Sequence, residues 1–496
     1  GESQWQISIS SSKQNDNKTR KLIDINSSLA GIAIALPAPL GKQKHEQRPL
    51  SIKTTLLDSA IEKIDIDFDG MLYTDIILDN TPDLKNKKMN VGLGDQATVT
   101  DNEHDIALQG ELEQLDLSEW IKFLDIKQLD NDKKNNKTIL MDFFVKRLKM
   151  LDNNFNDVQI KLTRSDKDWH ISFDSPDIKG IAKLIDVKDS EHERLEVDLE
   201  YIAIHGSEEK DKSSTVAIKN LPELQVNIAK TIYKNNDLGQ TTLTTKNITD
   251  GVNIEKLSFV KPDFSINASG KWTRADNIDR SEFSATLDAA SINDMFAAFG
   301  YQGANIEEGK TNITLSANWL YTPMNFSLEN INGQLDMNIE KGRFLDIDPS
   351  AGRLFGLLSL QTLPRRLALD FSDLFKKGFA FDSINGDFSL QQGHAYTNAL
   401  QMKGPAADII VSGRTGIVTE DYDQIATITP KLSISLPIAS ALFGPVGIGV
   451  GAVIYLTGEL FESIPRNINK ILSYQYSITG SWDNPNIEKI KDKTSG

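Results

Sequence analysis

The stretch NITLSANW, residues 312–319, carries the pattern that decides the fold of this chain. Ile313, Leu315 and Ala317 are apolar, and the residues between them, Thr314 and Ser316, are polar. Successive side chains of a β-strand point to opposite faces, so a period of two places one face in an apolar setting and the other in water. The stretch is therefore predicted to be a half-buried strand.

The same alternation recurs over most of the 496 residues. The alternating segments are short and are separated by Asn, Asp, Gly and Ser, which favour turns. No long strand–helix–strand spacing is present, so we expect a mainly β fold with an elongated antiparallel sheet. Clear examples are Ile64, Ile66 and Phe68; Ile266, Ala268 and Gly270; and Leu335, Met337 and Ile339.

Three segments that end on tryptophan indicate a weak internal repeat. They are FSINASGKW (residues 264–272), NITLSANW (312–319) and YQYSITGSW (474–482), each an alternating strand followed soon by a turn. In this interpretation each repeat is a pair of strands, and successive pairs lie side by side in one sheet. The alternative is that tryptophans simply cover strand ends.

Few short helices are expected. Residues 117–124, capped by Ser118, and residues 141–151 have helical spacing, and residues 291–300 begin at a capping serine and end at a glycine. The longest helical pattern follows Asp348, and Pro364 should divide it. The polar stretches 130–137 and 207–214 are predicted to be loops.

These patterns suggest five regions along the chain. We expect a body of alternating strands at 1–348, an amphipathic helical insertion at 349–377, a continuation of the body at 378–430, an apolar and amphipathic helical end-piece at 431–472, and a terminal strand and tail at 473–496.

Composition excludes several classes of function. The chain has 54 Lys and Arg against 70 Asp and Glu, a net charge of −16, which disfavours sequence-independent binding to nucleic acid. It has no cysteine, which rules out disulfides, thiolate catalysis and cysteine-based metal sites.

No motif of catalysis or cofactor binding stands in a convincing context. The six histidines form no His-Glu-x-x-His pair, and no nucleophile elbow or phosphate-binding loop occurs. The glycines at 447–452 lack the strand–helix–strand setting of a dinucleotide site, and DIDFD at 65–69 lacks the Gly and Glu of a calcium loop. We expect no enzyme, no catalytic residue, no metal site and no cofactor.

An apolar segment near the C-terminus is the most informative exception. Residues 432–458 carry no charge and are long enough to span a bilayer. A transmembrane helix is weakened by Pro437, Pro445 and the glycines beside them, and a buried helical hairpin is a second possibility. We favour an end-piece that inserts shallowly into a membrane or caps an apolar groove. Its membrane-contacting residues would be Leu436, Leu442, Phe443, Val446, Ile448, Val450, Val453, Ile454 and Leu456.

Four segments carry a resemblance to a known family. SSLAGIAIALPAPLGK (27–42), the stretch from GRLFGLLSLQTLPRR to GHAYT (352–397), ATITPKLSISLPIASALFGPVGIG (426–449) and YSITGSWDNPNIE (476–488) are similar to segments of the YhdP family of AsmA-like proteins. The most specific piece is LPRR at 363–366. The resemblance covers essentially the whole chain, as the C-terminal portion of a longer protein.

The resemblance implies a bridge-type lipid transfer protein. Members of this family are anchored in the inner membrane of Gram-negative bacteria by an N-terminal helix, which this sequence does not contain. They extend through the periplasm as a long sheet folded over a hydrophobic groove, and they conduct phospholipids between the inner and outer membranes. The C-terminal part lies toward the outer membrane, so phospholipids and that membrane are the expected partners.

Elementary physical chemistry gives such a groove a purpose. Burying hydrocarbon is worth about 0.8 kcal/mol per CH₂, so an apolar trough lowers the barrier to moving a lipid through water. Strand parity does not say which face lines the trough. An alternative is a periplasmic scaffold for outer-membrane proteins that offers sheet edges for strand addition. The candidate lipid contacts are Ile266, Ala268, Ile313, Leu315, Leu335, Met337 and Ile339.

Overall fold

The computed structural model contains 26 strands among the residues it describes, which divide into two compact units. Unit 1 comprises Gly1–Ser213 and Asn220–Asn235, and unit 2 comprises Ser214–Lys219 and Asn236–Gly496. The structure describes residues 3–13, 18–58, 60–78, 87–94, 103–117, 119–120, 138–150, 153–165, 168–185, 193–205, 221–276, 278–298, 306–344, 379–405, 407–431 and 473–490.

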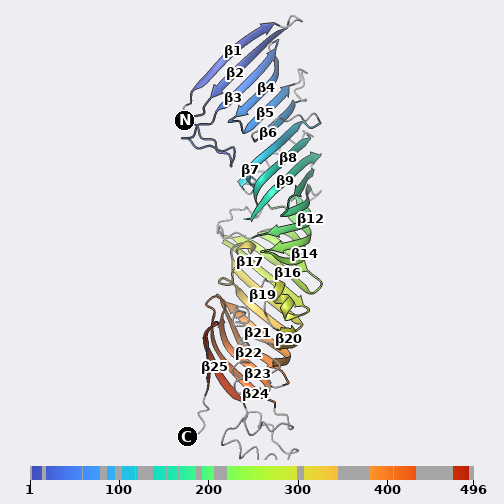
Figure 1. Ribbon diagram of the computed structural model, residues 1–496, viewed down its shortest axis with the longest axis vertical. Helices are drawn as coiled ribbons and strands as arrows, with labels where there is room; N and C mark the ends of the chain where they lie inside the picture. Colours follow the sequence, from blue (N-terminus) through green and yellow to red (C-terminus); the bar gives the residue numbers. More distant parts are fainter. Residues whose placement is uncertain are drawn as a thin grey trace, which may run out of the picture. The chain divides into compact units, whose positions relative to one another are not determined.

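Unit 1 is a single sheet of thirteen strands in the described ranges, coloured blue to green in Figure 1. Its strands are Trp5–Lys13 (β1), Thr19–Ser27 (β2), Leu50–Leu57 (β3), Ala60–Phe68 (β4), Leu72–Leu78 (β5), Lys87–Leu93 (β6), Ile106–Asp116 (β7), Ile139–Met150 (β8), Asn153–Ser165 (β9), Asp168–Asp174 (β10), Ile178–Ile185 (β11), Arg194–Ile204 (β12) and Glu223–Tyr233 (β13).

Neighbouring strands of unit 1 follow the chain order, and most of them pair antiparallel as predicted. Three pairs are parallel instead: β6 with β7, β7 with β8, and β12 with β13. A parallel connection needs about a dozen residues or more to bring the chain back to the same end. The connections at 94–105, 117–138 and 205–222 provide that length, and two of them contain the polar stretches predicted as loops.

The prediction of a helix at 141–151 is wrong, because residues 141–150 belong to strand β8. Val145 and Leu148 are both fully buried, and this spacing of three resembles a helix face. The spacing arises where the pairing of β8 with β9 skips Lys146 and Asp157, and Asp157 has a φ of +51°. A residue in that conformation interrupts the pleat, so the buried parity changes in mid-strand.

Unit 2 is likewise one sheet in the described ranges. Its strands are Asn236–Ile248 (β14), Gly251–Val260 (β15), Phe264–Ala275 (β16), Ile278–Ala289 (β17), Ile306–Glu308 (β18), Thr311–Leu320 (β19), Asn332–Phe344 (β20), Phe379–Gln391 (β21), His394–Lys403 (β22), Ala407–Gly416 (β23), Asp421–Pro430 (β24), Tyr474–Ser481 (β25) and Pro485–Lys489 (β26).

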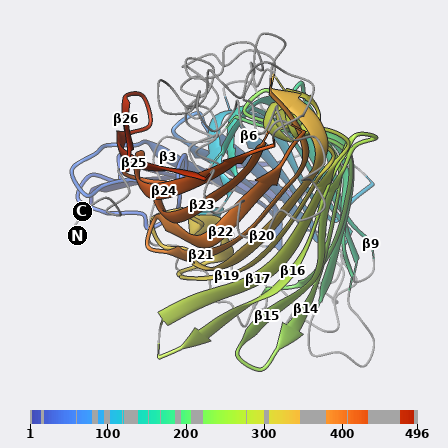
Figure 2. The same ribbon diagram turned by 90° about the horizontal axis from the view of Figure 1, so that it is seen from below.

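Within the described part of unit 2, neighbouring strands pair antiparallel throughout. Both β18 and β19 pair with β20, so together they form one interrupted strand beside it. Register shifts mark bulges in β15, between Ile254 and Leu257, and again between β21 and β22. Bulges increase twist and bend a strand, in keeping with the strong curvature of strands β14–β24 in Figure 2. No pairing between described residues joins β14 to β26, so the sheet of unit 2 is not closed.

Helix is rare among the described residues. The helix predicted at 291–300 is present as α3, Ile292–Ala298, and the Ser291 hydroxyl accepts the Asp294 backbone N–H at 3.1 Å as its cap. A single 3₁₀ turn, Pro323–Asn325 (η2), follows β19. The helices predicted at 349–377 and 431–472 lie outside the described residues, as does most of 117–124.

Two buried clusters stabilise the sheets. In unit 1 the core gathers where β7–β9 and β11–β13 pack, around Val145, Leu148, Phe155 and Val158. In unit 2 it extends from α3 to β26 and includes Ile384, Phe388, Val411 and Ile478. The core of unit 2 therefore fills one face of the strands from β20 onward.

An ion pair at one turn of unit 2 predicts how stability depends on pH. Arg414 donates two hydrogen bonds to Asp421, at 2.9 and 2.6 Å, and these bonds lower the pKa of Asp421 from 3.8 to about 2. A lowered carboxyl pKa stabilises the fold above pH 3.8, and this contribution disappears as the pH falls toward about 2. We expect Arg414→Met to cost about 1 kcal/mol at neutral pH, after allowance for solvent screening.

Urea unfolding of unit 2 at several pH values tests this expectation. The difference between wild type and Arg414→Met should shrink as the pH drops from 4 toward 2, since Asp421 becomes protonated in both proteins. A difference that stays constant across this range would show that the pair acts through packing alone.

Candidate functional site

The seven candidate lipid contacts of unit 2 lie on one face of the sheet. Ile266 faces Leu287, Leu287 faces Ile313, and Ile313 faces Met337, each directly across a strand pair. We call this series, begun by Phe259 on β15, the isoleucine row. Residues directly opposite in neighbouring strands point to the same side of a sheet, so the row forms one continuous apolar line.

A second line runs beside the first, two residues further along each strand. Its members, which we call the leucine row, are Leu257, Ala268, Ala285, Leu315, Leu335 and Phe388. Ile339 lies across from Thr311 on the same face. The structure thus brings together residues that the sequence could assign only strand by strand.

Exposure of this face changes along unit 2. The members of both rows in β16, β17 and β19 are half-buried, as are Leu335 and Met337 in β20. Ile339 is completely buried, and so are Phe388 and the apolar residues of β22–β25 on this side. The apolar face is thus only partly covered by its own side chains from β15 to β20, and it is filled beyond β20.

Unit 1 has an apolar face of the same kind, although no candidate residues were predicted there. One line crosses all thirteen strands through direct partners and is interrupted only by Thr74. Most of its members are half-buried. They are Ile7, Ile25, Ile52, Ile66, Thr74, Val91, Leu108, Met141, Leu162, Ile171, Ala182, Val197 and Val226.

The opposite face of each unit is polar. In unit 1, Asp24, Lys53, Asp65 and Asp75 are successive partners across β2–β5. Asp65 of DIDFD lies in this ladder and Ile66 and Phe68 lie on the apolar face, while Asp69 follows β4 and accepts a hydrogen bond from Arg48 at 2.7 Å.

A shallow hollow of about 460 Å³ lies over β15–β20 in unit 2, and Ala268, Ala285 and Leu315 also take part in its lining. Its lining is mainly hydroxyl and amide side chains, including Ser269, Ser284 and Ser316. Nearby, a hydrogen bond to Asp336 raises the pKa of Asp387, with smaller contributions from burial and from the charge of Asp336. These carboxyls are directly opposite each other on β20 and β21 and make the polar side of this region acidic.

No other kind of site competes with the apolar faces in the described ranges. No three His, Asp or Glu side chains there come together as metal ligands. No described helix has the length and hydropathy needed to cross a bilayer. The nine membrane-contacting candidates, from Leu436 to Leu456, lie outside the described residues.

Sequence reasoning missed part of this site. Leu257, Phe259 and Leu287 belong to the rows, and Leu287 could have been found from the alternation of TLDA in β17. The residues of β15 could not be found in this way. The bulge between Ile254 and Leu257 shifts the inward-facing residues from even-numbered to odd-numbered positions.

Comparison with known proteins identifies the family. A family model described as "YhdP protein" matches residues 1–487. The chain belongs to the YhdP family. One curated relative, the "Intermembrane phospholipid transporter YhdP" of Escherichia coli strain K12, is 27% identical over 227 residues, which are 45% of this chain. The matched part spans 17% of the length of that YhdP relative. No solved structure matches this YhdP family member significantly.

Membership of the YhdP family agrees with the architecture. Apolar and polar side chains alternate along most strands, so the sheet has one apolar face and one polar face. Such a sheet can hold apolar material on one side only.

Proposed function

We propose that this chain is part of a phospholipid conduit between the inner and outer membranes and that the apolar face of each unit shelters the acyl chains. The observation that supports the proposal most directly is the continuity of half-buried apolar rows through direct strand partners. The name of the E. coli relative supplies the class of cargo, phospholipid.

The energetic argument rests on the length of these rows. Neighbouring strands are about 4.8 Å apart, so the thirteen strands of unit 1 give an apolar line of about 60 Å. Each CH₂ kept out of water is worth about 0.8 kcal/mol, and a lipid moving along the line keeps this contact at every step. Transfer then needs no step in which both acyl chains enter water.

The polar face suits the same role. It is lined by charged and hydroxyl-bearing side chains that remain hydrated, while the apolar face takes the tails. The residues proposed to contact lipid in unit 2 are those of the isoleucine and leucine rows between β15 and β20. The proposal includes a periplasmic location, an inner-membrane anchor elsewhere in the full-length protein and contact of the C-terminal segment with the outer membrane.

Lipid extraction from the purified chain tests the proposal against a scaffold for outer-membrane proteins. We expect at least one phospholipid to co-purify with each chain, and delipidated protein should recover it from vesicles. A chain that carries no phospholipid but binds an unfolded barrel strand tightly would support the scaffold and reject the conduit.

A further inference from the structure

The apolar face of unit 2 has a gradient of polarity along its strands. At one end of β16 and β17, Arg274 and Asp279 form an ion pair with distances of 2.6 and 2.8 Å. One row further in, Trp272 lies across from Ser281, and Ser281 lies across from Trp319. We call these three residues the tryptophan row. Beyond it the same face continues through Gly270, Phe283 and Ala317 to the leucine row and then to the isoleucine row.

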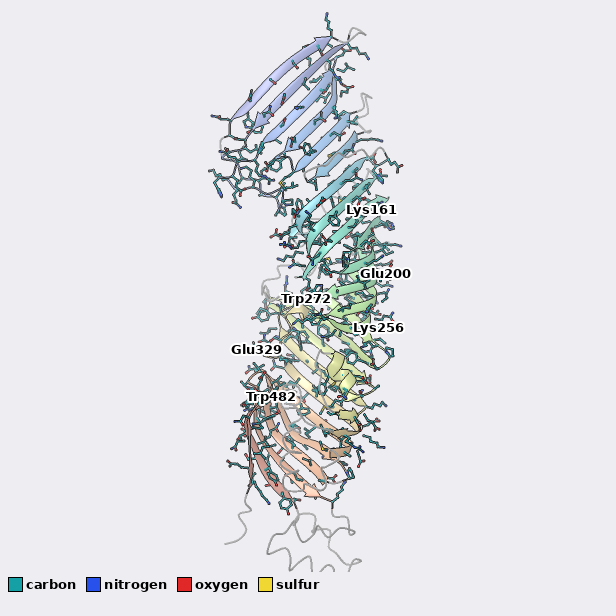
Figure 3. All side chains as sticks on the ribbon, viewed as in Figure 1. Lys161, Glu200, Lys256, Trp272, Glu329 and Trp482 are labelled. Atoms are coloured by element: carbon teal, nitrogen blue, oxygen red, sulfur yellow. The ribbon has the colours of Figure 1, made fainter. Side chains whose placement is uncertain are left out.

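Aromatic contacts give the tryptophan row a fixed shape. Ser281 is fully buried between the two tryptophans. Trp319 stacks on Phe283 with ring centroids 5.3 Å apart, and Phe326 meets Trp319 edge-on at the same distance. Figure 3 shows Trp272, Glu329 and Trp482 along one margin of unit 2.

The two indole groups differ in how their N–H donors are used. Trp319 donates to the carbonyl of Thr322 at 3.1 Å, whereas the indole nitrogen of Trp272 is buried without an acceptor among the described residues. A buried donor without an acceptor destabilises the fold, because it has lost its hydrogen bond to water and gained none in return. A bound molecule that brings an ester or phosphate oxygen to this row would remove the cost.

The opposite end of the same strands is closed by apolar side chains. Helix α3 packs there, and its Ile292 and Phe296 are buried. Met295 packs against the cluster of Phe264 and Ala289, the last partners at this end of β16 and β17. Apolar side chains of α3 and of the strand ends therefore cover the apolar face at this end.

The spacing suits one lipid leaflet. Trp272 and Phe264 are eight residues apart on β16, or about 27 Å at 3.4 Å per residue. Half the hydrocarbon core of a bilayer is about 15 Å thick, so acyl chains fit between the tryptophan row and α3. Tryptophan is enriched where hydrocarbon meets water, because its ring is apolar and its N–H is polar.

We propose that a phospholipid lies across β16–β19 with its acyl chains along the strands and directed at α3, and with its glycerol esters and headgroup at the tryptophan row. The inference rests on the proposed function and adds an orientation to it. Lipids would then move sideways from strand to strand, with all headgroups at the Arg274–Asp279 margin.

Quenching of tryptophan fluorescence by brominated lipid measures this orientation. Phosphatidylcholine that carries bromine either near the ester end or near the methyl end of its chains is added to the full chain. The signal of Trp272 is the difference between wild type and Trp272→Phe. A second probe, Ile266→Trp, reports the isoleucine row as its difference from wild type, and circular dichroism verifies that each variant is folded.

We expect ester-end bromine to quench Trp272 at least about twofold more than methyl-end bromine, with the opposite preference at position 266, because the two positions are about 20 Å apart along β16. Equal or reversed preferences would overturn the orientation and leave the conduit standing. Absence of quenching at both positions would overturn the orientation and the lipid-binding role of this face together.

Discussion

Replacing Leu315 with arginine is expected to block phospholipid passage while leaving the chain folded. Leu315 is half-buried in the middle of the leucine row, with Ala285 on one side and Leu335 on the other. A guanidinium there would keep its hydration and displace acyl chains from the row. Losing contact with about three CH₂ groups costs about 2.4 kcal/mol at each crossing. This corresponds to a reduction in rate of about 50-fold.

The neighbouring residue supplies a matched control. Ser316 follows Leu315 in β19 but lies on the polar face, where it is exposed. Ser316→Arg adds the same group to the same strand and should leave passage unchanged. The measurement is the arrival of labelled phospholipid at the outer membrane in cells that carry either variant in the full-length protein. Normal arrival with Leu315→Arg would remove this row from the conduit.

Truncating Phe388 to alanine is expected to have the largest effect on stability. Phe388 is 1% exposed and lies in the core of unit 2, across from Leu335. Removing a buried phenyl ring loses its burial and leaves a cavity, which costs about 3–5 kcal/mol. Because the two units have separate cores, the loss should be confined to unit 2.

Hydrogen exchange followed by mass spectrometry separates the two units in one experiment. Amides of β20–β24 should exchange faster in Phe388→Ala, while those around Phe155 in unit 1 keep their protection. Phe326→Ala is the control, since that ring is 43% exposed and its loss should cost less than about 1 kcal/mol. Equal acceleration in both units would mean that their stabilities are coupled.

The fold class could be read from the sequence because alternation is a local property. A strand with one buried face must place apolar residues at every second position, as Ile313 and Leu315 do. Antiparallel pairing could be predicted as well, because two consecutive strands joined by a short turn run in opposite directions. The gathering of seven separately predicted residues on one face follows from regular register in β16–β20.

The predictions that failed in β8 and β15 share a physical cause. The set of positions that faces the core, odd or even, can change within a strand. The bulge in β15 shifts its apolar set, and the irregularity at Lys146 and Asp157 makes β8 look helical. Neither position carries a Gly or Pro that would mark it. The parallel pairs of unit 1 depend on where a long connection returns, which the composition of that connection does not encode.

The extent of the exposed apolar face was also beyond sequence reasoning. Leu335 and Ile384 both stand in alternating strands, yet one is half-buried and the other fully buried. The difference comes from what packs over them, which depends on the curvature of the whole sheet. The tryptophan repeat, in contrast, was visible in the sequence, and in β16 and β19 it marks one end of the apolar face.

Site-specific crosslinking along a single strand tests the central claim most directly. A photo-reactive residue is placed in turn at positions 312–317 of β19 in living cells, and lipid adducts are counted by mass spectrometry. The account predicts adducts from Ile313 and Leu315, which are half-buried, with few or none from Asn312, Thr314, Ser316 and the buried Ala317. Adducts with no alternation, or none from Ile313 and Leu315, would contradict an apolar face that carries lipid.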